Sequence, residues 1–426
     1  MFPKFIMIRQ EHPSEKLTNV SEAIRVTMKE NVGETILSDL REKRVGIAVG
    51  SRGITNLPDI VRTLVQIVRD YGGEPIVFAA MGSHGDGQAK GQREVLASLG
   101  ITEDAVGATI ETCAESVSYG FTEDGMEVYG NSLALQYDRI ILMNRIKEHT
   151  DFEDITESGI FKLMAIGIGN PKGARIVHSH AISEGYGPVI RNAGALILKK
   201  LPVSFALAVT ENWKHETDSV EAILPENLLE AEMRILAGVK KRAIRLPVDQ
   251  FDSLIVEEAG KQFSGTCIDT KVVGRIMIRG QKEPESPKIK TIAVLDVTEE
   301  THGNTMGLGI ADVITRRLFD KINIHATGLT GMTSSCLLQA KIPCVVPTDQ
   351  DAIDAAFTAC GTLNFEDVDS VLIRNTSSLE YLCVSEHLFE KLKRENRFER
   401  DLRVCGEPFP LSFDDAGNMR AVPWQH

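Results

Sequence analysis

Short apolar runs alternate with amphipathic stretches along the first half of the chain. Residues 44–50 (RVGIAVG), 75–80 (PIVFAA) and 139–143 (RIILM) are continuous apolar runs, which are typical of strands buried on both faces. Between the first two, residues 57–71 place apolar side chains at helical spacing. Strands that alternate with helices indicate a parallel sheet.

The rest of the chain predicts further elements of the same two kinds. In the first half we expect helices at residues 19–28, 33–43, 88–99 and 225–243, and a strand at residues 203–209. In the second half we expect strands at residues 253–257, 291–297 and 370–374, helices at residues 308–321, 352–359 and 379–395, and an irregular tail from residue 404. The pattern predicts an α/β fold of two domains, each with a mostly parallel sheet flanked by helices.

The length of 426 residues also favours two domains. We expect an N-terminal domain at residues 1–245 and a C-terminal domain at residues 246–426 that closes a cleft holding the active site. A ligand at such a cleft is shielded from water.

Charge and composition narrow the class of protein. A net charge of −13 argues against a nucleic-acid partner, which needs a basic face, but it leaves room for an anionic small molecule. Seven scattered cysteines without a CxxC pair indicate neither a disulfide framework nor a zinc ribbon. The first ten residues lack a signal-peptide core and no run of 18 apolar residues occurs. We therefore expect a soluble cytoplasmic protein.

Three polar side chains follow the first three predicted strands of the parallel sheet. Arg52, His84 and His149 each lie in the loop after one of these runs, and such loops meet at the carboxyl edge of a sheet. A lone loop histidine is usually a solvated residue, but two at one edge can serve as acid and base on either face of a carbon. Arg52 precedes a helix start, where anions bind, or else is a surface residue paired with an acid.

Other residues of the chain carry possible chemistry. Lys162 lies in the apolar stretch SGIFKLMAIGIG, where it is either a desolvated nucleophile or a lysine whose amine reaches the surface. His178 and His180 are metal-type ligands that share a face only in a strand. Lys261 follows the strand at residues 253–257 and can hold a carboxylate in the cleft, whereas we interpret His302 as ordinary turn chemistry.

Taken together, these residues resemble the family of nickel-dependent lactate racemases and related enzymes that use a nickel-pincer nucleotide. The matching pieces are the strand and loop with Arg52, the MGSHG loop of His84 and the Lys-Glu-His149 segment. Farther along the chain, Ser158, Gly159, Lys162 and His178 follow in the same order as in the family. The resemblance extends over most of the chain, with its specific motifs within residues 45–180.

The resemblance implies a 2-hydroxy acid racemase or epimerase with a defined set of site residues. Nickel would be held in pyridine-3,5-bisthiocarboxylic acid mononucleotide, attached covalently to Lys162 beside Ser158 and Gly159, with His178 as the protein ligand of nickel. By the same resemblance His84 and His149 would alternate as acid and base, and Arg52 and Lys261 would hold the substrate carboxylate. Proteins that assemble the cofactor would be partners.

Two departures from the family bear on the substrate. Lactate racemases usually carry an Asp where this chain has Val49, and the segment between His149 and Lys162 is longer here. A larger or sugar-derived 2-hydroxy acid is therefore expected rather than lactate. His178 rather than His180 is chosen as the nickel ligand from its spacing to Lys162.

Two alternatives stay open. One is a zinc-dependent hydrolase that uses the four histidines His84, His149, His178 and His180. The other is a non-catalytic carboxylate-binding protein on the same fold.

Overall fold

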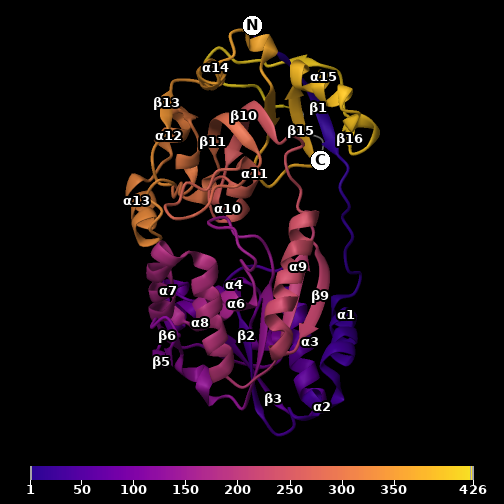
Figure 1. Cartoon of the computed structure of the whole chain (residues 1–426), viewed down its shortest axis with the longest axis vertical. Helices are drawn as coiled ribbons and strands as arrows, with labels where there is room; N and C mark the ends of the chain where they lie inside the picture. The colour runs from indigo at the N-terminus through magenta and orange to yellow at the C-terminus, as the bar shows by residue number, and fades with distance from the viewer. Residues whose placement is uncertain (1, 423, 425–426) are drawn as a thin grey trace. The chain divides into compact units, whose positions relative to one another are not determined.

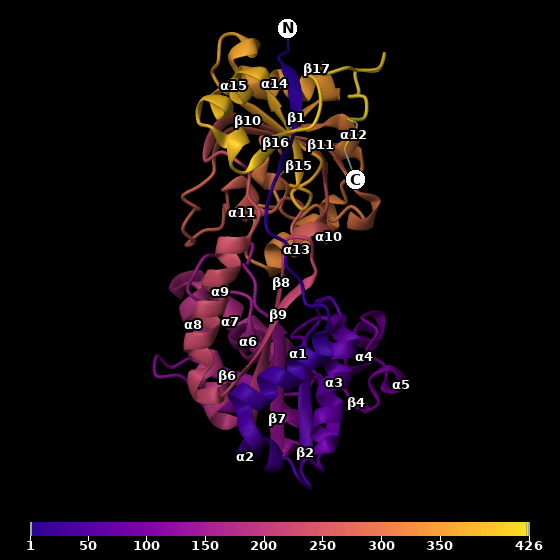
Figure 2. The same ribbon diagram turned by 90° about the vertical axis from the view of Figure 1, so that its right-hand side faces the viewer.

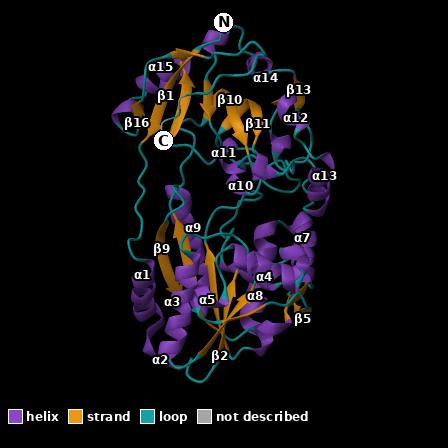
Figure 3. Cartoon of the chain, turned by 180° about the vertical axis from the view of Figure 1, so that it is seen from behind, coloured by secondary structure: helices purple, strands orange, loops and turns teal. Residues whose placement is uncertain are grey.

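The computed structural model describes residues 2–422 and 424 and divides into two compact units. The central unit is Ser14–Ala243, and the split unit combines Met1–Pro13 with Ile244–His426. Each unit holds a mostly parallel sheet with helices on its two faces (Figures 1 and 3). The predicted α/β fold class is confirmed.

The sheet of the central unit has the strand order β4-β3-β2-β7-β8-β9. Its strands are β2 (Arg44–Val49), β3 (Glu74–Ala79), β4 (Thr109–Glu111), β7 (Arg139–Arg145), β8 (Val203–Glu211) and β9 (Thr217–Ile223). All neighbours pair in parallel except β8 and β9, which are antiparallel. The four strands predicted in this half correspond to β2, β3, β7 and β8.

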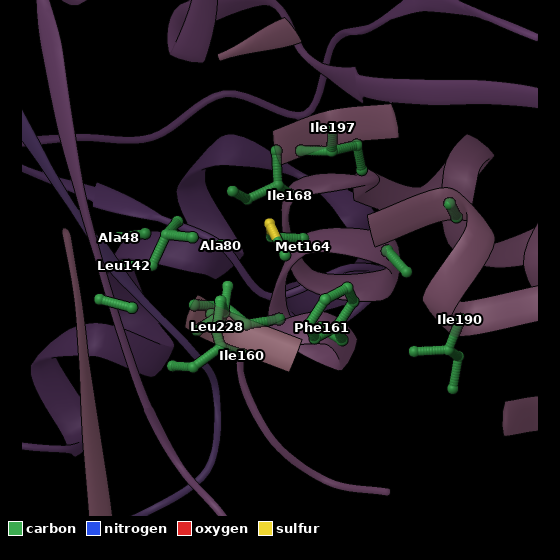
Figure 4. Packing of buried hydrophobic residues seen from close by; sticks show 14 of the residues in the cluster. Ala48, Ala80, Leu142, Ile160, Phe161, Met164, Ile168, Ile190, Ile197 and Leu228 are labelled. Atoms are coloured by element: carbon green, nitrogen blue, oxygen red, sulfur yellow. The ribbon is translucent and has the colours of Figure 1, made fainter. Parts of the chain in front are cut away.

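Side chains of β7 show why the middle of this strand is apolar on both faces. Ile140 and Leu142 enter one core with the helices that follow His149, and Figure 4 shows part of that core around Leu142. Ile141 and Met143 enter the opposite core with helices from the first third of the chain. Because both faces are covered, the four middle positions of the strand, residues 140–143, are all apolar, and its polar side chains lie at the two ends.

The helices of the central unit cover these two faces. They are α1 (Val20–Thr27), α2 (Gly33–Ser38), α3 (Leu57–Asp70), α4 (Ala89–Ser98), α5 (Glu103–Val106), α6 (Ile160–Lys162), α7 (Asn170–Glu184), α8 (Tyr186–Lys200) and α9 (Leu228–Arg242). A hairpin of β5 (Ser116–Phe121) and β6 (Glu127–Asn131) forms a separate small sheet. Among the described residues of the whole chain, no helix is long and apolar enough to cross a membrane.

The sheet of the split unit has the order β13-β12-β11-β10-β14-β15-β1-β16, with β17 also paired to β1. The strands are β1 (Lys4–Gln10), β10 (Gln250–Ala259), β11 (Lys288–Val297), β12 (Val313–Thr315), β13 (Cys344–Val346), β14 (Ser370–Ile373), β15 (Tyr381–Ser385), β16 (Leu402–Val404) and β17 (Phe409–Pro410). Strands β10 to β14 are parallel, and β15, β1, β16 and β17 are antiparallel to their partners.

Strand β1 corrects the predicted domain division. The N-terminal domain was expected to span residues 1–245, but Phe5 pairs with Ser385 and Ile8 with Val404, so β1 lies among the last strands of the chain (Figure 2). Ile6 and Ile8 are buried in the core of the split unit. A pairing across so many residues leaves no local signal in the sequence.

Two predicted helices were wrong in the same way. Residues 308–321 form a short turn, β12 and α12 (Arg316–Asp320), and residues 379–395 contain β15 and α15 (Glu386–Arg394). In each case a helix starts directly after a strand, and Thr315 caps the first of them by accepting from the Leu318 N–H. Strands this short do not show a period of their own.

The remaining helices of the split unit are α10 (Lys261–Ser264), α11 (Thr270–Val273), α13 (Ile324–Thr333) and α14 (Asp349–Ala359). The predicted helix at residues 352–359 lies within α14. Its start is fixed by reciprocal hydrogen bonds between Thr348 and Asp351.

Candidate active site

The sheet of the central unit has a topological switch point between β2 and β7. From β2 the chain proceeds outward to β3 and β4, and then returns to the other side of β2 as β7 and β8. The loops after β2 and β7 therefore lead away from each other, and ligands of open α/β sheets bind in the crevice that this leaves at the carboxyl ends. Arg52 follows β2 and His149 follows β7.

The loop after β3 brings His84 to the same edge. Gly82 and Gly85 have φ angles of +60° and +67°, and a Cβ on Gly85 would lie 2.4 Å from the backbone nitrogen of Gln92. This tight loop needs glycine at both positions. The Nδ1 of His84 forms a hydrogen bond with Ser51 Oγ in the loop after β2. The predicted meeting of these loops is thus seen in a direct contact between two of them.

His84 is a neutral imidazole near pH 7. Desolvation by the surrounding loops, together with the positive charges of Arg52 and Lys162, lowers its pKa to about 4. The residue nevertheless keeps an exposed surface. A neutral, accessible imidazole can accept a proton from a bound molecule.

His149 and Lys162 contact each other directly. The Nε2 of His149 and the Nζ of Lys162, which is the last residue of α6, form a hydrogen bond. The N–H of Asp151 donates to His149 Nδ1 at 3.0 Å. Since a neutral imidazole carries one proton, that proton is on Nε2 and faces the lysine amine. Lys162 must then accept it as a free amine.

The pKa values agree with this proton arrangement. Burial, with Asp151 and Glu157 opposing and Arg52 and Lys147 adding, lowers the pKa of Lys162 to about 7. Burial and the charge of Lys162 hold the pKa of His149 well below its usual range. A lysine with a near-neutral pKa is a nucleophile at physiological pH.

His178 lies on α7 and is linked to His149 through a run of stacked rings. The ring of His149 stacks on Phe152 with centroids 4.7 Å apart, Phe152 stacks on Tyr186 at 5.2 Å, and Tyr186 meets His178 edge-on at 5.7 Å. The Tyr186 hydroxyl lies 3.5 Å from His178 Nδ1. Burial, and then the charge of Lys162, lower the pKa of His178 to about 4, so its ring is neutral.

His180 is in a different setting. Both residues belong to helix α7, where positions two apart do not share a face. His180 Nδ1 pairs with Glu184 Oε1 at 3.2 Å, and its side chain is 41% exposed. The helical geometry therefore separates the two histidines of the HSH segment.

Ser158 and Gly159 are held next to Lys162 by backbone contacts. The backbones of Lys147 and Ser158 exchange hydrogen bonds of 2.9 and 3.1 Å, and Asn144 Nδ2 donates to the Gly159 carbonyl at 2.7 Å. The segment before Lys162 is thereby fixed to the end of β7.

A buried carboxylate anchors the loop that begins at His149. Glu157 is fully buried, accepts the His149 backbone N–H at 2.6 Å and forms an ion pair with Lys240 of α9 at 2.6 Å. The longer segment between His149 and Lys162 is therefore an ordered part of the site, and it supplies Phe152. The sequence alone does not indicate the roles of Glu157 and Phe152. Their partners, Lys240 of α9 and Tyr186 of α8, lie far away in the sequence.

Positive charge gathers at this edge of an acidic protein. Arg52, Lys147 and Lys162 all lower the pKa of His149.

Lys261 belongs to the split unit, where it begins α10 and its N–H donates to Thr301 Oγ1 at 3.3 Å. Within the described residues, no group of three or more His, Cys, Asp or Glu side chains is arranged to hold a metal ion.

Comparisons with known proteins give a likeness of fold to solved structures. No family model matches the chain, and no curated protein sequence matches it. The solved structure of the lactate racemase apoprotein from Thermoanaerobacterium thermosaccharolyticum is 14% identical, with a TM-score of 0.49, and the match covers 80% of this chain and 93% of that one.

Proposed function

We propose that this chain is a racemase or epimerase of a 2-hydroxy acid that uses a nickel-pincer nucleotide attached to Lys162. The observation that carries the proposal is the amine of Lys162, which has a pKa of about 7 and contacts His149. Such an amine is suited to forming a covalent bond with a carboxyl-type group of a cofactor.

The donor groups of the site fit this cofactor. A metal that arrives with its own sulfur donors requires few protein ligands, and His178 offers a neutral imidazole within electrostatic reach of Lys162. Ser158 and Gly159 would lie beside the attached group. When bound, the cofactor would supply a hydride acceptor and donor for the carbinol carbon of the substrate.

His84 and His149 are the proposed acid and base. Both are neutral near pH 7, so each can take the hydroxyl proton of a substrate and give it back. Once acylated, with loss of a proton and of the leaving group of the acyl donor, the Lys162 nitrogen would no longer accept a hydrogen bond from His149 Nε2. The ring of His149 would then be available to the substrate.

Arg52 would bind the substrate carboxylate, and we propose the same role for Lys261 of the split unit. A guanidinium and an ammonium group fix a carboxylate by charge-assisted hydrogen bonds. Val49, which stands where the family has an Asp, is a fully buried apolar residue at the end of β2. The carboxylate that lactate racemases carry there is therefore missing, which supports a 2-hydroxy acid other than lactate.

The test is the intact mass of the denatured protein made together with a cofactor-assembly pathway. We expect a nucleotide-sized mass increase on the wild type and on Lys172→Ala, an exposed lysine of α7, and none on Lys162→Ala. Absence of the adduct on the wild type, while a known racemase receives it from the same pathway, would contradict the proposal. Loss of activity on chelation without an adduct would then favour the zinc hydrolase, and carboxylate binding that survives every histidine substitution would favour the binding protein.

A further inference from the structure

A buried glutamate caps the short helix that carries Lys162. Glu232 of α9 is fully buried, and its Oε2 accepts hydrogen bonds from the backbone N–H groups of Ile160 at 2.7 Å and Phe161 at 3.1 Å. These are the first two residues of α6, and Lys162 is the third. Unpaired N–H groups at a helix start attract an acceptor, and the preceding residue provides no side-chain cap.

The space for this carboxyl group exists because residue 159 is glycine. A Cβ at Gly159 would lie 2.4 Å from Glu232 Oε1, closer than any real contact. The backbone of Gly159 is extended, with a φ of −176°, so other residues are excluded by the glutamate and not by backbone strain. Gly159 and Glu232 therefore form a matched pair.

The hydrogen bonds that Glu232 accepts fix the backbone directly before Lys162. Only one peptide unit separates Phe161, whose N–H is held, from Lys162, whose Nζ contacts His149. No other described side chain is seen to accept from these two N–H groups. Burial also raises the pKa of Glu232 to about 7, against the two N–H donors. Keeping an acid in this environment is costly to a fold, which argues for a positional role.

We propose that Glu232 is a positioning residue that holds the first turn of α6 and thereby keeps the Lys162 amine desolvated against His149. This role for Glu232 deepens the proposed function. It rests on the proposed function only for the use that the Lys162 amine is put to. The contact itself exists without any cofactor. It can therefore be tested on the full chain made in the absence of the assembly pathway.

The experiment measures acylation of the Lys162 peptide by a small amine-reactive ester as a function of pH. In Glu232→Ala the first turn loosens and Nζ reaches water, so we expect the midpoint of the pH profile to rise by at least one unit. At pH 7 this corresponds to a roughly fivefold smaller free-amine fraction. Glu232→Gln retains an acceptor for the two N–H groups and should restore most of the wild-type midpoint. Glu230→Gln, exposed on the same helix, should change nothing.

A folded Glu232→Ala protein with an unchanged midpoint would overturn the proposal and leave Glu232 a purely structural residue. If Glu232→Ala does not fold, Gly159→Ala tests the same contact from the other side, because its methyl group displaces the carboxyl group. It should raise the midpoint in the same direction, and an unchanged midpoint would again overturn the proposal. A cofactor adduct that fails to form while these shifts appear would contradict only the proposed function.

Discussion

The sheets of the two units share a switch point, but the titratable groups near it differ in kind. Both sheets change direction beside a central strand, between β2 and β7 in one and between β10 and β14 in the other. At the first edge, burial lowers the pKa of bases, as in His149 and Lys162. At the second edge, burial raises the pKa of acids, to about 7 for Glu257.

The difference lies in how the charged groups are matched. In the split unit, Asp296 is paired with Arg317 at 3.1 Å and with Lys321 at 2.9 Å, and Glu257 accepts from the Trp424 indole at 2.5 Å. In the central unit, His149 meets another base, Lys162. Asp296 is neutralised by two cations, whereas His149 and Lys162 are two bases held against each other, an arrangement typical of reactive sites. We therefore propose that the reactive groups lie in the central unit.

The largest expected effect is the loss of either proposed acid–base residue. In protein loaded with the cofactor, His84→Ala or His149→Ala should lower the rate of stereoinversion by about 10²–10⁴, because one face of the substrate loses its proton acceptor. The adduct on Lys162 should remain, as seen by intact mass. His302→Ala, at an exposed histidine of the split unit, is the matched control. Full inversion in either site variant would refute the two-base assignment.

A smaller effect is expected for the one residue that would give the split unit a share in binding. Lys261→Ala should raise KM for the 2-hydroxy acid about tenfold or more with a lesser change in kcat, since a lost charge-assisted hydrogen bond is worth about 1.5–3 kcal/mol. Steady-state kinetics beside Lys341→Ala, an exposed lysine of the same unit, measures it. An unchanged KM would mean that Lys261 does not bind the substrate, and the central unit alone would then supply the proposed binding residues.

The smallest expected effect concerns Glu257, near the carboxyl end of β10, and the pH dependence of the free energy of unfolding. The folded pKa of Glu257, about 7, lies above its ordinary value of 4.5, so the native state binds more protons between these values. Stability from this group is then present at low pH and is lost as pH rises toward 7. Glu257→Gln should remove this loss, on the order of 1 kcal/mol after allowance for partial exposure.

Urea unfolding at pH 5 and pH 8 measures that change, with Glu366→Gln at an exposed position as the control. A variant that loses stability with pH as steeply as the wild type would show that Glu257 ionises normally. The split unit would then have no shifted acid to set against the shifted bases His149 and Lys162 of the central unit.

Features of the fold that depend on neighbouring residues could be predicted from the sequence. Features that depend on residues far apart in the chain could not. The runs at residues 44–50 and 139–143 are buried on both faces, so their composition alone identifies them as strands. The loops after them could be placed at one edge because a parallel sheet leaves no other option. Strand β1 could not be assigned correctly, since its partners lie at the far end of the chain.

The same distinction applies to the site. Arg52, His84, His149 and Lys162 are chemically unusual for their surroundings and could be nominated one by one. Glu232 resembles any other glutamate of a charged helix, and only its position against Gly159 reveals it. The stacked rings of Phe152 and Tyr186 were equally hidden, because each looks like ordinary core.

Strand β1 also has a consequence for how the protein is made. Arg9 of β1 pairs with Glu380, 371 residues later. At about 5–20 residues per second, on the order of 20–70 s of translation separates these two residues. During that time the first strand has no partner, while the central unit can fold behind it. A fragment limited to Ile244–His426 would lack the strand between β15 and β16, so the two ends of the chain have to be expressed together.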